Sequence, residues 1–141
     1  MKQELARDWM TRDVITISPE TSLREAHEIM KTRRVRRLPV VDHGRIVGMV
    51  TLGDVRGAEP SQASSLSVWE LNDLVAKLKV AEIMSRDPVT IQQNASIGEA
   101  ARIMLEKKFS GLPVVDEAGH LVGIITESDI FRLVAHEWSK D

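Results

Sequence analysis

Residues 38–51 read LPVVDHGRIVGMVT, and residues 112–126 read LPVVDEAGHLVGIIT, so the chain carries two near copies of one stretch. In each copy a proline precedes a valine pair, a turn with glycine follows, and a second apolar run ends at threonine. Proline cannot donate a ladder hydrogen bond and therefore suits the entry of a strand. A short turn with glycine joins two antiparallel strands. Each stretch therefore predicts two strands and the turn between them.

The duplication continues on the N-terminal side of these stretches. Residues 10–17 align with residues 84–91 at an offset of 74, and residues 22–26 align with residues 96–100 at the same offset. One extra residue in the second turn raises the offset to 75 for the residues that follow it. So many matches in the same order identify an internal repeat.

Each copy predicts the same succession of elements. Residues 14–17 and 89–91 are short β-branched runs, which are typical of strands. Ser-x-x-Glu at residues 22–25 and 96–99 forms capping boxes, in which serine and glutamate satisfy the free amides of a helix start. Apolar residues at helical spacing follow both boxes. With the two strands quoted above and a helix after the threonine, each copy reads β-α-β-β-α.

The segment between the copies has two parts. Residues 57–67 are rich in Gly, Pro, Ser and Gln and predict an exposed loop. Residues 68–78 have apolar residues at helical spacing and predict a connecting helix. We therefore expect a first repeat at 8–57, a linker with its helix at 58–81, a second repeat at 82–135 and a tail at 136–141.

Composition places the chain among ordinary soluble proteins. Its 141 residues are 43% hydrophobic and 28% charged, which is enough to build a core. The net charge of −2 gives no general attraction to nucleic acid or to membrane surfaces. The absence of cysteine excludes disulfides, thiolate metal ligands and thiol catalysis. Because the chain has no signal-like start and no apolar run near the roughly 20 residues that span a bilayer, we expect a cytoplasmic protein without a membrane partner.

The Thr-x-x-Asp pairs that follow the second predicted strand are the candidate binding groups. They are Thr51 with Asp54, and Thr126 with Asp129. An ionised carboxylate only accepts hydrogen bonds and suits the two hydroxyls of a ribose. The threonine hydroxyl and the free amides of a helix start suit phosphate oxygens. The competing interpretation is a capping box, which stabilises a helix by about 1 kcal/mol without any ligand.

The order of these motifs resembles the CBS domain, named from cystathionine β-synthase, in a tandem pair. The motifs are the short strand, the capped helix, Leu-Pro-Val-Val-Asp, Gly-x-[IL]-Val-Gly and Thr-x-x-Asp, each present twice in register. The resemblance implies an α/β (α+β) fold, in which two β-α-β-β-α repeats pack through their sheets with pseudo-twofold symmetry and leave two clefts. It also implies regulation by AMP, ADP, ATP or S-adenosylmethionine.

In this family each cleft joins the Thr-x-x-Asp of one repeat to the first strand and the pre-strand loop of the other. Carried over, the resemblance implies one cleft with Thr126, Asp129, Val14, Ile15, Thr16, Val35, Arg36 and Arg37. The other cleft would hold Thr51, Asp54, Pro88, Val89, Thr90, Phe109, Ser110 and Gly111.

The two implied clefts differ in charge. Arg36 and Arg37 belong to a basic run, and a guanidinium can hold a phosphate in bidentate fashion. The other cleft has Ser110 and Gly111 at the matching place, so we expect phosphate in the arginine-lined cleft and an uncharged adenosine ligand in the other. The basic run also permits a solvated helix end or, less readily, a nucleic-acid patch. No aromatic residues interleave with it for base stacking.

Other chemistries find little support in the sequence. The four histidines, His27, His43, His120 and His136, have no metal-ligand spacing, and no nucleophile with a paired base stands out. We therefore expect no enzyme, no catalytic cofactor and no metal site. Four methionines at matching repeat positions predict core packing: Met10, Met30, Met84 and Met104.

Taken together, the sequence predicts a sensor of an adenosine-containing ligand. Trp9, Trp69 and Trp138 lie in or near the flanking helices, and CBS pairs usually associate through helical faces, so a homodimer is expected. No effector domain is present, so the output passes to an unknown partner protein or the chain is one segment of a longer protein. The alternative is a protein–protein adaptor or dimerisation module with unused clefts. An enzyme acting on nucleotides is the remote third possibility.

Overall fold

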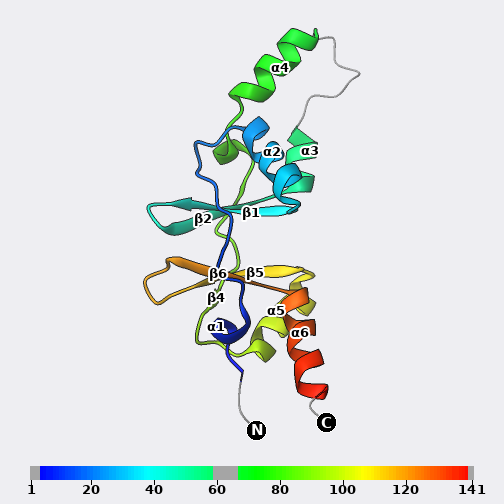
Figure 1. The fold of residues 1–141 in the computed structure, drawn as a ribbon. Helices are drawn as coiled ribbons and strands as arrows, with labels where there is room; N and C mark the ends of the chain where they lie inside the picture. Colours follow the sequence, from blue (N-terminus) through cyan, green and yellow to red (C-terminus); the bar gives the residue numbers. More distant parts are fainter. Residues whose placement is uncertain (1–3, 59–66, 140–141) are drawn as a thin grey trace. The chain divides into compact units, whose positions relative to one another are not determined.

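Figure 1 shows the computed structural model of the chain, which describes residues 4–58 and 67–139. The sequence also predicts an exposed loop over residues 57–67 and a tail over residues 136–141. Residues 59–66 of that loop and residues 140–141 of that tail lie outside the described residues. None of the helices in the described ranges combines the length and the apolar character that crossing a membrane requires.

The chain divides into two compact units. One unit is Ile15–Pro88, and the other joins Met1–Val14 to Val89–Asp141. Each unit contains a three-stranded sheet and its own helices. The predicted α/β (α+β) class with two similar halves is therefore confirmed.

The unit Ile15–Pro88 contains an antiparallel sheet with strand order β1-β2-β3. Figure 1 shows α2 and α3 on the same face of the β1–β2 hairpin. The predicted connecting helix is present as α4. The elements are α2 (Leu23–Arg33), β1 (Arg37–Asp42), β2 (Arg45–Thr51), α3 (Leu52–Ala58), α4 (Val68–Lys77), the 3-10 helix η1 (Val80–Glu82) and β3 (Ser85–Arg86).

The second unit repeats this plan. Its strand order is β4-β5-β6, in which β4 pairs parallel to β5 and β6 pairs antiparallel to β5. Figure 1 shows α5 and α6 on one face of the β5–β6 hairpin. The elements are α1 (Ala6–Trp9), β4 (Ile91–Gln92), α5 (Ile97–Lys107), β5 (Gly111–Val115), β6 (Leu121–Thr126) and α6 (Glu127–Trp138).

Both predicted helix starts are confirmed by their caps. The hydroxyl of Ser22 accepts a hydrogen bond from the amide of Glu25 at 3.1 Å, and Ser96 does the same for Glu99 at 3.1 Å. Each cap satisfies one amide that the helix cannot pair internally. The matching caps explain why α2 and α5 begin at equivalent residues.

The first strand of each repeat is shorter than the sequence predicts. Residues 14–17 form only a bridge from Ile17 to Val40, and residues 89–91 contribute only Ile91 to the two-residue strand β4. β-branched composition favours an extended backbone, but a ladder needs a partner strand along its whole length. Here the partner is available only near the C-terminal end of each run.

Each sheet is extended by the segment that leads into the other sequence repeat. The amide of Thr11 donates to the carbonyl of Ile124 in β6 at 2.8 Å, and the reverse bond measures 2.9 Å. In the other unit, Ser85 pairs with Met49 of β2. The compact units therefore divide within the leading segments of the repeats and not between the repeats.

Methionines fix these exchanged segments in place by packing against glycine. A Cβ atom on Gly48 would lie 2.5 Å from Sδ of Met84, and one on Gly123 would lie 2.6 Å from Sδ of Met10. Only glycine leaves room for each thioether. Met10, Met30 and Met104 are buried in the two cores and Met84 packs against one of them, so the predicted core role of the methionines is confirmed.

The glycine contacts lead to a stability prediction. Replacing Gly123 with Ala should lower the free energy of unfolding by about 1–3 kcal/mol, because the added methyl overpacks against Met10. Urea denaturation monitored by circular dichroism measures this loss.

The matched control is Gly98→Ala in α5. Its Cβ would meet only the Ser96 hydroxyl, at 3.8 Å. Alanine also suits a helix better than glycine, so stability should be unchanged or higher by about 0.5–1 kcal/mol. Equal denaturation midpoints for the two variants would contradict the packing role of Gly123.

Candidate functional site

The threonine and the aspartate of the Thr-x-x-Asp pair at the start of α6 are hydrogen-bonded to each other. The amide and the hydroxyl of Thr126 donate to Oδ2 of Asp129 at 2.8 and 3.0 Å. Asp129 is only 5% exposed and is the buried charged residue of the described core. Its carboxylate therefore stands at the mouth of α6, where the helix dipole favours a negative charge.

The second oxygen of Asp129 is held by the unit's N-terminal segment and by α6 itself. Nη2 of Arg132 donates to Oδ1 at 2.6 Å, and the hydroxyl of Thr11 donates to the same atom at 3.4 Å. A carboxylate has about four acceptor positions, so these two bonds and the two from Thr126 use all of them. A further hydroxyl at Oδ1 would therefore compete with these donors.

Arg132 connects the carboxylate to α1. Its Nη2 atom also donates to the carbonyl of Trp9 at 3.0 Å, and its guanidinium lies 5.7 Å from the centre of the Trp9 ring. The Trp9 ring in turn lies 5.7 Å from the ring of His136, and its Nε1 donates to Glu4 at 3.1 Å. A movement of Arg132 away from Asp129 would therefore also change the contacts of Arg132 with Trp9.

The Thr-x-x-Asp pair at the start of α3 is less crowded. The amide of Thr51 donates to Oδ2 of Asp54 at 2.9 Å, and the amide of Asp54 donates back to the Thr51 hydroxyl at 3.1 Å. Asp54 is half-buried. Within residues 4–58 and 67–139, no protein group donates to Oδ1 of Asp54. Oδ1 of Asp54 therefore accepts no hydrogen bond from the described residues, whereas Oδ1 of Asp129 does.

Both pairs therefore make the capping arrangement that the sequence analysis weighed against ligand binding. The cap and a ligand do not compete for all of the same atoms, because the amide bond occupies one oxygen of each carboxylate. The cap also fixes the rotamer of the aspartate, which lowers the entropy lost when a ligand binds.

Each Thr-x-x-Asp lies beside the pre-strand loop of its own repeat. Arg37 is the register partner of Thr51, and the amide of Leu52 donates to the carbonyl of Arg36 at 2.7 Å. In the other unit Gly111 is the register partner of Thr126. The loop cations and the helix mouth are therefore neighbours in the first repeat.

The predicted site residues fall in both units. The unit Ile15–Pro88 contains Ile15, Thr16, Val35, Arg36, Arg37, Thr51, Asp54 and Pro88. The other unit contains Val14, Val89, Thr90, Phe109, Ser110, Gly111, Thr126 and Asp129.

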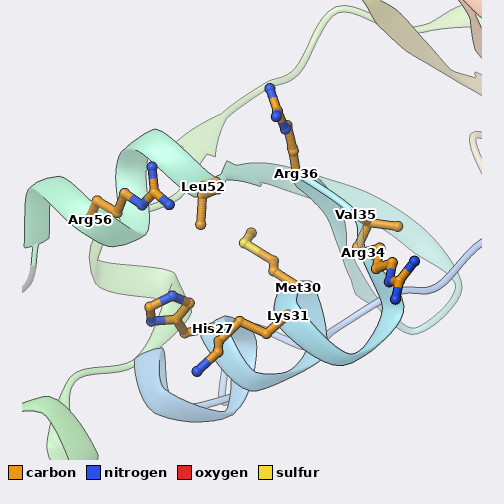
Figure 2. Close-up of a pocket in the computed structure, with 8 residues that line it drawn as sticks. All are labelled: His27, Met30, Lys31, Arg34, Val35, Arg36, Leu52 and Arg56. Atoms are coloured by element: carbon orange, nitrogen blue, oxygen red, sulfur yellow. The ribbon is translucent and has the colours of Figure 1, made fainter.

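A pocket of about 300 Å³ opens in the unit Ile15–Pro88, between α2 and α3 (Figure 2). Of the predicted site residues, Val35 and Arg36 line it. The sequence analysis did not select the remaining lining residues, although three of them follow one face of α2 at helical spacing. Those residues are His27, Met30, Lys31, Arg34, Leu52 and Arg56.

Within the described residues, no group of three His, Cys, Asp or Glu side chains could hold a metal ion. The site offers carboxylate acceptors at the helix starts and arginines near one of them, which are group types that suit hydroxyls and phosphates.

Comparison with protein families identifies two copies of one domain. The family model of the CBS domain matches residues 6–61 and 80–136. A CBS domain-containing protein of Dictyostelium discoideum is 34% identical over 131 residues, which cover 92% of this chain and 90% of that protein. An inosine-5'-monophosphate dehydrogenase of Korarchaeum cryptofilum is 36% identical over 134 residues. The match covers 95% of this chain and 25% of the enzyme, so the chain spans a quarter of that relative's length.

Solved structures of similar fold contain adenosine ligands. CBSX2 of Arabidopsis thaliana in complex with AMP has a TM-score of 0.80 and 30% identity, covering 95% of this chain and 98% of that one. The CBS domain pair of protein MJ0100, in complex with 5'-methylthioadenosine and S-adenosyl-L-methionine, has a TM-score of 0.76 and 31% identity. That match covers 96% of this chain and 99% of the other.

The contacts of Arg132 generate a second stability prediction. Arg132→Ala should lower the free energy of unfolding by about 1–3 kcal/mol, because it leaves the buried Asp129 carboxylate without its charged donor. It should also change the fluorescence of Trp9, since the guanidinium stacked near the ring is lost. Urea denaturation and emission spectra measure the two effects.

Arg102→Ala in α5 is the matched control. Arg102 is exposed, and its loss should change stability by less than about 0.5 kcal/mol. If Arg132→Ala lowered the free energy of unfolding no more than Arg102→Ala does, the ion pair between Arg132 and Asp129 would not contribute to stability.

Proposed function

This chain belongs to the CBS domain family, and we propose that it is a regulatory module that binds an adenosine-containing ligand in clefts between its two repeats. The ligand is an adenine nucleotide (AMP, ADP or ATP) or S-adenosylmethionine. The observation that carries this proposal is the carboxylate at the mouth of α3 and of α6, repeated in register in both halves of the chain. The AMP complex of CBSX2, with nearly the same length and fold, supports it.

The two aspartates are the proposed ribose acceptors. Each cap bond holds one carboxylate oxygen and leaves the aspartate in a fixed rotamer, ready to accept from the 2'- and 3'-hydroxyls. The adenine is proposed to lie against the short extended segments 14–16 and 88–90, where backbone groups can pair with its edge. The hydrogen bond that caps the helix is therefore proposed to hold the aspartate in position for the ribose.

The two clefts are proposed to prefer different ligands. The resemblance assigns Arg36 and Arg37, which attract phosphate, to the cleft of Asp129, and a ribose there would compete with Arg132 and Thr11 for Oδ1. Asp54 offers an oxygen that no described group occupies, and the resemblance assigns Ser110 and Gly111 to its cleft, although the backbone of Arg36 and Arg37 also adjoins Thr51. The nucleotide therefore goes to the Asp129 cleft, and uncharged adenosine goes to the Asp54 cleft.

Ligand binding regulates by shifting the balance between two states of the module, in proportion to the difference in affinity for them. The proposed effector is a separate protein or another part of a longer chain, and the proposed location is the cytoplasm. The module itself is proposed to catalyse no reaction and to use no metal.

A homodimer is proposed as the form that senses the ligand. Several large apolar side chains on the helices are exposed, among them Trp69 and Trp138 at 83% and Leu105 at 80%. Exposed apolar groups of this size favour association. The same exposed groups favour the alternative function, a protein–protein adaptor with unused clefts. Calorimetric titration with AMP, ATP and S-adenosylmethionine separates the two functions, because an adaptor would give no binding heat with any of them.

The ribose role predicts a distinct pattern of lost affinity. Asp54→Ala should weaken adenosine binding, and Asp129→Ala should weaken ATP binding, each by about 1–3 kcal/mol, because each removes a hydrogen-bond acceptor from one cleft. Isothermal titration calorimetry measures both affinities.

Asp42→Ala, at the exposed end of β1, is the control and should bind both ligands as the wild type does. Because the variants also lose a cap, their folding is checked by circular dichroism at the titration temperature. Wild-type affinity in both Asp54→Ala and Asp129→Ala would show that the ribose sites are wrongly assigned.

A further inference from the structure

Arg132 holds the aspartate of the second repeat, and the first repeat has no such residue. Nη2 of Arg132 donates to Oδ1 of the buried Asp129 carboxylate at 2.6 Å. The equivalent position of the first repeat, at the offset of 75, is Gly57, which has no side chain that could reach Asp54. The hydrogen bond from the threonine amide to the aspartate is nevertheless present in both repeats. The guanidinium is therefore not needed to form the cap.

The contact with Arg132 opposes any ligand that uses Oδ1 of Asp129. A hydrogen bond between a guanidinium and a carboxylate is roughly twice as strong as one between neutral groups. A ribose hydroxyl is a neutral donor, so exchanging the guanidinium for the hydroxyl loses binding energy. The Arg132 side chain is 58% exposed, so water can solvate it after release. The ligand must gain the remaining difference through another of its groups.

The same guanidinium also binds Trp9, the last residue of α1. Nη2 of Arg132 donates to the carbonyl of Trp9 at 3.0 Å, and the guanidinium lies 5.7 Å from the centre of the Trp9 ring. One nitrogen atom thus joins the Asp129 carboxylate to α1. The first repeat has Ile83 at the position of Trp9, so it lacks this connection as well. Release of Arg132 from the carboxylate therefore also alters the contacts of Trp9.

We propose that Arg132 is an internal competitor for the ligand at Asp129, and that its release carries the binding signal to Trp9. This inference rests on the proposed function, because it concerns how the Asp129 cleft selects and reports its ligand. The phosphates of a nucleotide supply the binding energy that releases Arg132. Adenosine lacks that energy and binds at Asp54, where no described group competes for Oδ1. Arg132 thus determines the difference in specificity between the two clefts.

The first test removes the competitor and uses adenosine as the probe. In ¹H–¹⁵N spectra of the full chain, the amide of Thr126 reports on the Asp129 cleft and the amide of Thr51 reports on the Asp54 cleft. Arg132→Met keeps an unbranched apolar side chain but loses the guanidinium. It should lower the adenosine concentration that half-saturates the Thr126 shift by about tenfold, because a charge-assisted donor no longer competes. The midpoint of the Thr51 shift should not change.

Arg102→Met, at an exposed position of α5, is the matched control and should titrate as the wild type does. Circular dichroism at the titration temperature checks that both variants are folded. A Thr126 midpoint in Arg132→Met that equals or exceeds the wild-type value would overturn the competitor role.

The second test places a competitor in the first repeat, where the fold has room for it. A Cβ atom on Gly57 would have no neighbouring atom within 4 Å, and Gly57 follows Asp54 by three residues within α3. Side chains at this spacing meet on a helix. Gly57→Arg should therefore raise the adenosine midpoint of the Thr51 amide by about threefold to tenfold. Gly57→Met is the matched control and should keep the wild-type midpoint; equal midpoints in the two variants would contradict the proposal.

The third test follows the signal at Trp9 during titration with AMP. The Nε1–H resonance of Trp9 is assigned through its loss in Trp9→Phe. In the wild type this resonance should shift with the same midpoint as the Thr126 amide. In Arg132→Met the Thr126 shift should remain and the Trp9 shift should be lost. A Trp9 resonance that stays in place in the wild type, or that shifts equally in Arg132→Met, would overturn the transmission to Trp9.

These titrations also separate this inference from the proposed function. If the cap amides respond to ligand but Arg132→Met does not lower the Thr126 midpoint, the role of Arg132 is wrong and the adenosine sites stand. If neither cap amide responds to adenosine or AMP in the wild type or in any variant, the proposed function fails and the competitor role falls with it. A Thr126 response to adenosine that appears only in Arg132→Met supports both.

Discussion

The hydrogen bond from a threonine amide to an aspartate carboxylate at the mouth of α3 and of α6 is the interaction on which the account depends. It measures 2.9 Å in one repeat and 2.8 Å in the other. This bond lies where the second hairpin strand ends and the helix begins, and it also fixes the rotamer of the aspartate. The proposed ligand binding can therefore use the same arrangement that caps the helix.

The duplicated fold allows the two halves to differ in chemistry while keeping one backbone. In one half, Asp54 retains an oxygen that no described group occupies, whereas in the other Asp129 is buried and held by Arg132. The surface between the two helices is basic in the first repeat and largely apolar in the second. The serine caps of α2 and α5, the bond from the threonine amide to the aspartate and the glycine–methionine contacts are nevertheless present in both halves.

Much of the fold follows from the sequence because its signals are local. The Leu-Pro-Val-Val-Asp stretches, the Ser-x-x-Glu caps and the matching methionines each specify structure within a few residues, and the structure confirms them. The pairing of Thr11 with Ile124 is a long-range contact, and β-branched composition does not name a partner strand. The short strand at residues 14–17 was overestimated for the same reason.

The candidate site was less fully predictable. The spacing of Thr and Asp in each motif identified the helix mouths, but the role of Arg132 depends on a turn of helix that brings position i+3 back to the carboxylate. That spacing is visible in the sequence as Asp129-x-x-Arg132. The pocket between α2 and α3 was missed because its lining comes from α2, from the loop that leads to β1 and from α3, which only the folded unit brings together.

The amide resonances of Thr51 and Thr126 test the central claim most directly, since each reports on the carboxylate that it caps. In ¹H–¹⁵N spectra of the labelled chain titrated with AMP, at least one of these two amides should shift in a saturable way and rank among the largest changes. If both cap amides stay in place while AMP reaches millimolar concentration, the aspartates serve their helices alone and the adenosine-binding account is contradicted.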